Sequence, residues 1–239
     1  MLEIVAVPAF SDNYIWLVHD AASGETAAVD PGDAAPALAE AERRGWTINQ
    51  VWNTHWHPDH TGGNVAAKTA TGCVVSGPGI RPIGGVDVSL AEGDEVRIGD
   101  HAAAVWAIPG HTLDHIALVF DSERIAFVGD TLFAMGCGRL FEGTAEQMHG
   151  SLQRLASLPD DTRLYCGHEY TLANAMFAAH AEPDNAAIAE RLARVDDMRS
   201  AGLITLPTTV ADERLTNPFV RASSSQEFAR LRAEKDSFR

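Results

Sequence analysis

The chain has 239 residues, 46% of them hydrophobic and 21% charged, a composition typical of a globular protein with a sizeable buried core. Its formal charge of −15, from 33 acidic against 18 basic side chains, argues against the basic face that nucleic-acid binding needs. No apolar stretch approaches the roughly 18 residues of a membrane helix, and no basic segment precedes an apolar run at the start. We therefore expect no membrane span and no signal peptide.

Up to about residue 168, short apolar runs alternate with Gly, Pro, Asp and Asn, and these runs predict strands. The predicted strands are 4–8, 14–18, 26–29, 48–52, 73–75, 105–108, 116–120, 125–128 and 164–166. Helical periodicity predicts helices at 35–44, 64–71 and 144–155, the last with Thr144 as N-cap and Gln147 three residues later. Interleaved strands and helices, with an antiparallel succession near 94–128, predict an α/β sandwich of sheets flanked by helices.

The character of the sequence changes after His168. Ala-rich helical patterns cover 171–180 and 184–200, Pro207 and Pro218 indicate a loop, and 226–235 predicts a final helix. We therefore place a domain boundary near 168–170, with a catalytic domain over 1–168 and a helical domain over 169–239.

The strongest chemical signal directly follows the predicted strand 48–52. It reads Thr54-His55-Trp56-His57-Pro58-Asp59-His60. Three imidazoles and a carboxylate this close together suit a divalent ion that accepts nitrogen and oxygen ligands. In extended backbone His55 and His57 point to the same side, and Pro58 keeps His57 out of helical geometry. Asp59 and His60 are adjacent, so we expect their side chains to diverge and one loop to address two metals.

Single candidate ligands follow three further predicted strands. They are His111 in Pro109-Gly110-His111-Thr112, Asp130 in Gly129-Asp130-Thr131 and His168 in Gly167-His168-Glu169. Each alone is ordinary turn chemistry. Their common position after a strand, where loops gather at one sheet edge, favours a metal centre over scattered surface histidines.

This H-x-H-x-D-H motif, with single His, Asp and His residues after later strands, resembles the metallo-β-lactamase superfamily over most of residues 1–168. The resemblance implies an αββα sandwich with two metals at one sheet edge. It assigns the first metal to His55, His57 and His111, the second to Asp59, His60 and His168, and the bridge between them to Asp130.

Narrower motifs resemble the glyoxalase II family, the hydroxyacylglutathione hydrolases, over nearly the whole chain. They are GDTLF at 129–133, GCGR at 136–139, FEGT at 141–144, GHEYT at 167–171, NPF at 217–219 and LRAEKDSF at 231–238. The resemblance implies hydrolysis of S-D-lactoylglutathione to glutathione and D-lactate, the second step of methylglyoxal detoxification. The glutathione contacts that it implies are Arg139, Phe141, Tyr170, Asn174, Arg232 and Lys235.

The sequence departs from the family pattern at three positions. Arg139 stands where the family usually has Lys, Phe141 where it often has Tyr, and Asp114 where a Gly is common. A substrate contact through a hydroxyl group would be missing at Phe141, whereas a backbone contact there would survive.

Arg232 and Lys235 are three residues apart on a predicted helix and therefore share a face. On spacing alone, a solvated face balanced by Glu234 and Asp236 is the simpler interpretation. Together with the resemblance, the pair indicates a clamp for the glycine carboxylate of glutathione, with Arg as a planar fork and Lys as a point charge.

The implied cofactor is a pair of divalent ions, with zinc favoured and iron or manganese as alternatives. We expect them to lower the pKa of a bound water to about 7 or below, giving a hydroxide that attacks the thioester carbonyl. Asp59 and Asp130 are the carboxylates that we expect in catalysis. A glutathione thiolate, with a reference pKa of about 8.5, leaves without a dedicated general acid.

Other titratable residues receive less specific interpretations. Asp30 supports the site from behind or belongs to an ordinary Asp-Pro-Gly turn. His115 begins a strand and is a supporting or core residue. Surface or structural roles are expected for His19, His101, His149 and His180, and a nucleophilic role is not expected for Cys137 or Cys166.

Alternative functions remain open from the sequence. A persulfide dioxygenase would use one iron on this fold, a lactonase or nuclease would use the same site for another hydrolysis, and a non-catalytic module would only bind glutathione. We expect a small-molecule substrate, no nucleic-acid or membrane partner, and a monomer. Three scattered cysteines, Cys73, Cys137 and Cys166, favour the reducing cytoplasm over a disulfide framework.

Overall fold

The computed structural model describes residues 1–238, which divide into two compact units. The first unit comprises Met1–Ala107 and Asp114–Gly129, and the second comprises Ile108–Leu113 and the chain from Asp130 onward. These units divide the chain at other places than the domain boundary near 168, which stays a prediction.

The first unit contains a mixed six-stranded sheet in the order β1 to β6. Its strands are β1 (Leu2–Ala9), β2 (Asn13–Asp20), β3 (Glu25–Val29), β4 (Gln50–Trp52), β5 (Val74–Pro78) and β6 (Val88–Leu90). Strands β1 to β3 are antiparallel, whereas β3 to β6 run parallel. Val29 pairs with Trp52, so the segments that follow β3 and β4 leave the sheet side by side.

The same unit contains an antiparallel run of four strands. They are β7 (Glu95–Ile98), β8 (His101–Ala107), β9 (Ile116–Phe120) and β10 (Ile125–Gly129). Trp52 of the first sheet and Phe120 of this run are fully buried, with ring centroids 6.0 Å apart. The two sheets therefore pack face to face, and apolar side chains between them exclude water.

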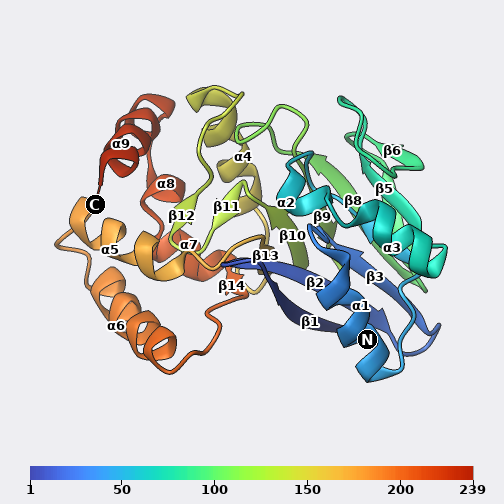
Figure 1. The fold of residues 1–239 in the computed structure, drawn as a ribbon. Helices are drawn as coiled ribbons and strands as arrows, with labels where there is room; N and C mark the ends of the chain where they lie inside the picture. The colour runs from blue at the N-terminus through green and yellow to red at the C-terminus, as the bar shows by residue number, and fades with distance from the viewer. Residues whose placement is uncertain (239) are drawn as a thin grey trace. The chain divides into compact units, whose positions relative to one another are not determined.

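Helices α1 (Ala34–Arg44) and α3 (Asn64–Thr71) cover the outer face of the first sheet (Figure 1). Side chains alternate along β4, so that Val51 joins the cluster under the helices while Trp52 faces the second sheet. The side chain of Asp33 caps α1 by accepting a hydrogen bond from the Ala35 amide. A short helix, α2 (Pro58–Thr61), follows β4.

The second unit is mostly helical. Its elements are β11 (Leu132–Phe133), β12 (Gly136–Cys137), α4 (Ala145–Ala156), β13 (Arg163–Cys166), α5 (Thr171–Ala181), α6 (Ala186–Ser200), β14 (Thr208–Thr209), α7 (Val210–Thr216), α8 (Pro218–Arg221) and α9 (Ser225–Ser237). Phe177, Phe219 and Phe228 form a buried aromatic row whose successive ring centroids are 5.7 Å apart.

The structure confirms the predicted strands and helices within a few residues, including the capping box of Thr144 and Gln147 at α4. The predicted loop between Pro207 and Pro218 is wrong, because α7 forms between these prolines and α8 begins at Pro218. Thr209 caps α7, and Pro218 occupies the first turn of α8, where its fixed φ and missing N–H favour a helix start.

Within residues 1–238, every helix falls short of the length and apolar character that a membrane crossing requires.

Candidate metal centre

Asp30 follows β3 and supports the histidine motif from behind. Its carboxylate accepts hydrogen bonds from the amide and the hydroxyl of Thr54, each at 2.7 Å, and its side chain is buried. The turn that it begins packs tightly on α2, since a Cβ on Gly32 would lie 1.8 Å from the carbonyl oxygen of Asp59. The paired ends of β3 and β4 thus fix Asp30 beneath the motif.

His55 and His57 lie close together in the irregular segment between β4 and α2, which agrees with the prediction that both point to one side. Nε2 of His55 is 3.0 Å from Nδ1 of His57. The Thr54 hydroxyl donates to Asp30 and lies 3.0 Å from Nδ1 of His55, so it is placed to accept that ring's N–H. This relay favours the His55 tautomer whose Nε2 lone pair faces His57 and is available to a metal.

The expectation that Asp59 and His60 diverge is wrong. Oδ2 of Asp59 lies 3.5 Å from Nε2 of His60, because Pro58 starts the short helix α2 and both side chains project from one helical turn. Asn13 donates to the same Asp59 oxygen at 3.1 Å. These two neighbours are therefore arranged to share one ion, and whether the loop addresses two metals stays a prediction.

His115 is fully buried and stacks on a candidate ligand. Its ring lies 4.6 Å from that of His55, with an interplanar angle of 15°. Its Nδ1 donates to the carbonyl of Ile116 at 3.1 Å. This agrees with the supporting role predicted for His115.

The second unit brings together the other three predicted ligands. Oδ2 of Asp130 lies 3.2 Å from Nε2 of His168 and 3.6 Å from Nε2 of His111. All three side chains are buried. The carboxylate of Asp130 is thus placed to share a metal ion with either histidine.

The surroundings of His111 and His168 fix their rings. Nδ1 of His111 donates to the carbonyl of Arg139 at 2.9 Å, which leaves its Nε2 as the lone-pair nitrogen near Asp130. The ring of His168 stacks on Tyr170 at 4.8 Å and 4°. Tyr170 is thus placed beside a predicted ligand.

In each unit, the histidine nitrogens and aspartate oxygens described above suit a divalent metal ion. Imidazole nitrogen and carboxylate oxygen are the ligands that zinc and its neighbours accept. The four separations given above, 3.0, 3.2, 3.5 and 3.6 Å, are close to the roughly 3.3 Å between two ligands on one tetrahedral zinc ion. A further trio in the first unit, Asp30, His55 and His60, has all its donor atoms within 4.8 Å of one another.

Arg232 and Lys235 are less exposed than a solvated helix face would leave them. Arg232 is 6% exposed and donates to the carbonyl of Cys137 and to Asp236, both at 2.9 Å. Lys235 donates to the carbonyl of Ala173 at 3.1 Å. Burial lowers the pKa of Lys235, and the nearby charges of Arg232 and Arg139 lower it further. The three cations therefore lie close enough to interact.

The other predicted substrate residues differ in exposure. The side chain of Phe141 is 63% exposed, and Arg139 and Tyr170 also reach the surface. Asn174 is buried and donates to the carbonyl of Ala134 at 3.2 Å. Asn174 therefore has a structural role between α5 and the β11–β12 connection, whatever its role toward a substrate.

The cysteines near the site are poor nucleophiles. Burial raises the pKa of the Cys137 thiol to about 11, and burial also raises the pKa of Cys166. Both therefore remain neutral thiols at neutral pH, which agrees with the sequence interpretation.

Sequence reasoning missed a buried ion pair between Arg191 and Glu213, whose atoms lie 2.8 Å apart. Glu213 is 1% exposed and accepts a hydrogen bond from the amide of Met135. The only sequence signal was a Glu on the apolar side of a short helix, which is weak without the tertiary contact.

Comparison with known proteins covers the whole chain. Residues 10–80 and 76–168 match the metallo-beta-lactamase superfamily, and residues 169–238 match the hydroxyacylglutathione hydrolase C-terminus. A hydroxyacylglutathione hydrolase of Methylococcus capsulatus is 51% identical over 97% of this chain and 91% of that protein. One of Pseudomonas fluorescens is 48% identical over the full length of both.

The chain belongs to the hydroxyacylglutathione hydrolase family. It is therefore a hydrolase with a divalent-metal site, as the histidine and aspartate donors indicate. Family membership also confirms the resemblance drawn from the GDTLF, GHEYT and NPF motifs.

Solved structures establish the fold. The crystal structure of ETHE1 from Myxococcus xanthus matches with a TM-score of 0.76 and 26% identity, over 100% of this chain and 92% of that one. The BLEG-1 B3 metallo-beta-lactamase matches with a TM-score of 0.70 over 92% of this chain and 100% of that one, at 20% identity. The chain therefore has the metallo-β-lactamase fold with a helical C-terminal region.

Proposed function

We propose that the chain is a binuclear-metal thioesterase that hydrolyses S-(2-hydroxyacyl)glutathione, with S-D-lactoylglutathione as its substrate. The observation that carries this proposal is Asp130, whose single oxygen Oδ2 lies beside both His111 and His168. Its context is a chain similar to hydroxyacylglutathione hydrolases along its full length. Asp130 thus lies at ligand-to-ligand distance from one histidine assigned to each ion, as a bridging carboxylate would.

We assign the metal ligands by the family motif. His55, His57 and His111 would hold one ion, Asp59, His60 and His168 the other, and Asp130 both. The convergence of Asp59 with His60 supports their assignment to the same ion. When bound, two divalent ions supply a water of lowered pKa and a Lewis acid for the carbonyl oxygen. Zinc is favoured, with iron or manganese as alternatives.

The chain's own residues orient and protect this chemistry. Asp30 acts through Thr54 to fix the tautomer of His55, and the Arg139 carbonyl does the same for His111. Asp59 and Asp130 contribute the negative charge that balances the ions. No general acid is required, because the thiol of the leaving glutathione has a pKa near 8.5.

We propose that the cationic group Arg139, Arg232 and Lys235 attracts the anionic glutathione moiety. Its support is the pKa of Lys235, which burial lowers and which the neighbouring charges of Arg232 and Arg139 lower further, in a chain whose net charge is −15. Because Arg232 is buried, the more exposed Arg139 and Lys235 are the better placed to meet the glycine carboxylate. Phe141, Tyr170 and Asn174 complete the proposed set of contacts.

An alternative is the persulfide dioxygenase reaction, which the sequence leaves open on the same fold. The crystal structure of ETHE1 is similar over all of this chain. That similarity is 26% in identity, against 51% for the hydroxyacylglutathione hydrolase of Methylococcus capsulatus. The two reactions are separated by supplying S-D-lactoylglutathione and glutathione persulfide to the same preparation. Loss of thioester absorbance without oxygen uptake supports hydrolysis, and oxygen uptake with the persulfide alone would overturn it.

We further propose that the protein acts in the cytoplasm as a monomer, without a nucleic-acid or membrane partner. Within residues 1–238 the three cysteines are buried and form no disulfide, which suits a reducing compartment. The excess of acidic over basic side chains opposes binding to nucleic acid or to anionic lipid.

A further inference from the structure

The β11–β12 hairpin connects a proposed metal ligand to a proposed substrate contact. Asp130 precedes it and Arg139 follows it. Its two legs close on each other where the Gly138 amide donates to the carbonyl of Thr131 at 3.2 Å. A Cβ on Gly138 would lie 2.0 Å from the Asp130 carbonyl oxygen and 2.9 Å from Nδ1 of His111. The legs of the hairpin therefore pack directly on the His111 ring and on the Asp130 backbone.

Glu213 and Asn217 hold the turn of the hairpin, together with the contact from Asn174 described above. The Glu213 carboxylate accepts from the amide of Met135 at 2.8 Å. The Asn217 side chain donates to the carbonyl of Gly136 at 2.9 Å and to the same carboxylate at 2.8 Å. Asn217 is fully buried, and Met135 has a φ of 59°, which an L-residue keeps only where its surroundings enforce it.

A buried cation completes the network. Arg191 of α6 donates to the other oxygen of Glu213 at 2.8 Å and to the hydroxyl of Thr208 at 2.7 Å. This pairing allows Glu213 to remain ionised away from water and to accept several hydrogen bonds at once. The network thus joins α6, α7 and the start of α8 to the hairpin turn.

We propose that Asn217 and Glu213 are positioning residues of the metal centre, which act through the β11–β12 hairpin on His111 and Asp130. The inference rests on the proposed role of His111 and Asp130 as ligands. If it is correct, the C-terminal region has two functions: it binds glutathione, and it raises the affinity of the chain for metal.

The test is zinc affinity, measured by competition with a chelating dye on the full-length chain. Asn217→Ser keeps the cap of α8, because a Ser hydroxyl can also accept from the Phe219 amide, but it removes the bonds to the hairpin. Loss of such outer-shell support lowers metal affinity by about tenfold or more. Unchanged zinc affinity in this variant would overturn the proposal.

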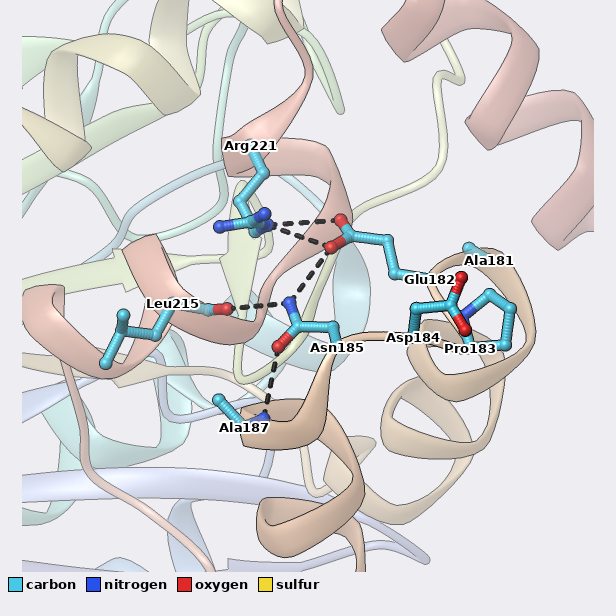
Figure 2. Close-up of a pocket in the computed structure, with 8 residues that line it drawn as sticks. All are labelled: Ala181, Glu182, Pro183, Asp184, Asn185, Ala187, Leu215 and Arg221. Carbon is cyan, nitrogen blue, oxygen red and sulfur yellow. Dashed lines mark hydrogen bonds and ion pairs between the residues drawn. The ribbon is translucent and has the colours of Figure 1, made fainter.

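Asn185→Ser is the matched control. Asn185 caps α6 in the same way and donates to Glu182 and to the carbonyl of Leu215 (Figure 2). None of the hydrogen bonds described for it reaches the hairpin. We expect Asn185→Ser to unfold at a lower temperature but to bind zinc as the parent does. Equal loss of zinc affinity in both variants would indicate general destabilisation and contradict a positioning role.

A second pair of variants covers the case in which Asn217→Ser does not fold. Replacing the buried ion pair with neutral side chains leaves no uncompensated charge. Arg191→Met with Glu213→Gln retains an amide oxygen for the Met135 N–H, whereas Arg191→Met with Glu213→Leu has no acceptor there. We expect the Gln variant to keep more of the parent's zinc affinity than the Leu variant. Equal affinities would contradict the proposal.

These results separate the inference from the proposed function. A parent chain that binds zinc but does not cleave S-D-lactoylglutathione would contradict the proposed reaction. The effect of the variants on zinc affinity would still test the positioning role. A parent chain that cleaves the thioester, with variants that bind zinc unchanged, would overturn the positioning role alone. A parent chain without affinity for zinc, iron or manganese would overturn both.

Discussion

Oδ2 of Asp30 lies 3.2 Å from Nδ1 of His60, and both side chains are buried. The same oxygen accepts the Thr54 hydroxyl, which in turn lies against His55. One carboxylate that is not itself an assigned ligand thus orients two proposed ligands. Because this carboxylate lies against Nδ1 of His60, Nε2 is the nitrogen of that ring that faces Asp59 and is available to a metal, so we expect Asp30 to contribute to metal binding.

Asp30→Asn should therefore weaken zinc affinity by roughly 10- to 100-fold. The amide places an N–H₂ group against either Thr54 or His60, where the carboxylate had an acceptor. Chelator competition measures the change. Asp33→Asn is the control, since Asp33 lies in the same turn and an Asn caps α1 equally well. Equal zinc affinity in the Asp30 variant and the parent would contradict the account.

Arg232→Ala should lower both stability and substrate affinity. The side chain is buried, bonds to Cys137 and Asp236, and lies 5.1 Å over the ring of Phe219. Loss of charge-assisted hydrogen bonds predicts a fall of roughly 2 kcal/mol in the free energy of unfolding, measured by urea titration.

Arg230→Ala on the same helix provides the comparison for Arg232. Arg230 forms an exposed pair with Glu234 at 2.9 Å, so its loss should change the unfolding free energy by less than about 0.5 kcal/mol and leave KM unchanged. Equal changes in unfolding free energy and KM in the two variants would contradict the interpretation of Arg232 as a buried residue that holds the hairpin through Cys137.

The lowered pKa of Lys235 predicts a pH dependence of substrate affinity. Since burial and neighbouring cations favour the neutral amine, Lys235 loses its charge at a lower pH than an ordinary lysine. Affinity for the anionic substrate should be full below this pKa and should weaken as the pH rises through it. KM measured against pH, with spontaneous hydrolysis subtracted, reports the change.

Lys235→Arg isolates this effect from titration of the substrate itself. A guanidinium stays protonated throughout the range, so the rise in KM that belongs to Lys235 should disappear or move to higher pH. An identical KM profile in the variant and the parent would show that Lys235 does not contact the glutathione moiety.

Local chemistry made much of the fold and the ligand motif predictable. The two-residue spacing of His55 and His57 predicts that their rings come together, and Thr144 marks the start of α4, because both effects act within a few residues. The convergence of Asp59 with His60 was not predictable in this way, because it depends on α2, a helix too short to show periodicity.

Contacts between residues that are far apart in the chain could not be predicted from the sequence. The spacing of Arg232 and Lys235 shows that they share a face but not that Arg232 is buried on the carbonyl of Cys137, 95 residues away in sequence. The same holds for Glu213, which meets Met135 across 78 residues. Such pairings depend on tertiary packing, which neither periodicity nor capping signals encode.

The most direct test of the central claim is hydrolysis of S-D-lactoylglutathione, followed as loss of thioester absorbance, with metal content determined on the same sample before and after chelation. The account predicts turnover with about two metal ions per chain, its loss on chelation and its return when zinc, iron or manganese is restored. Turnover that persists in the metal-free chain, or one iron per chain with oxygen uptake and no thioester cleavage, would contradict it.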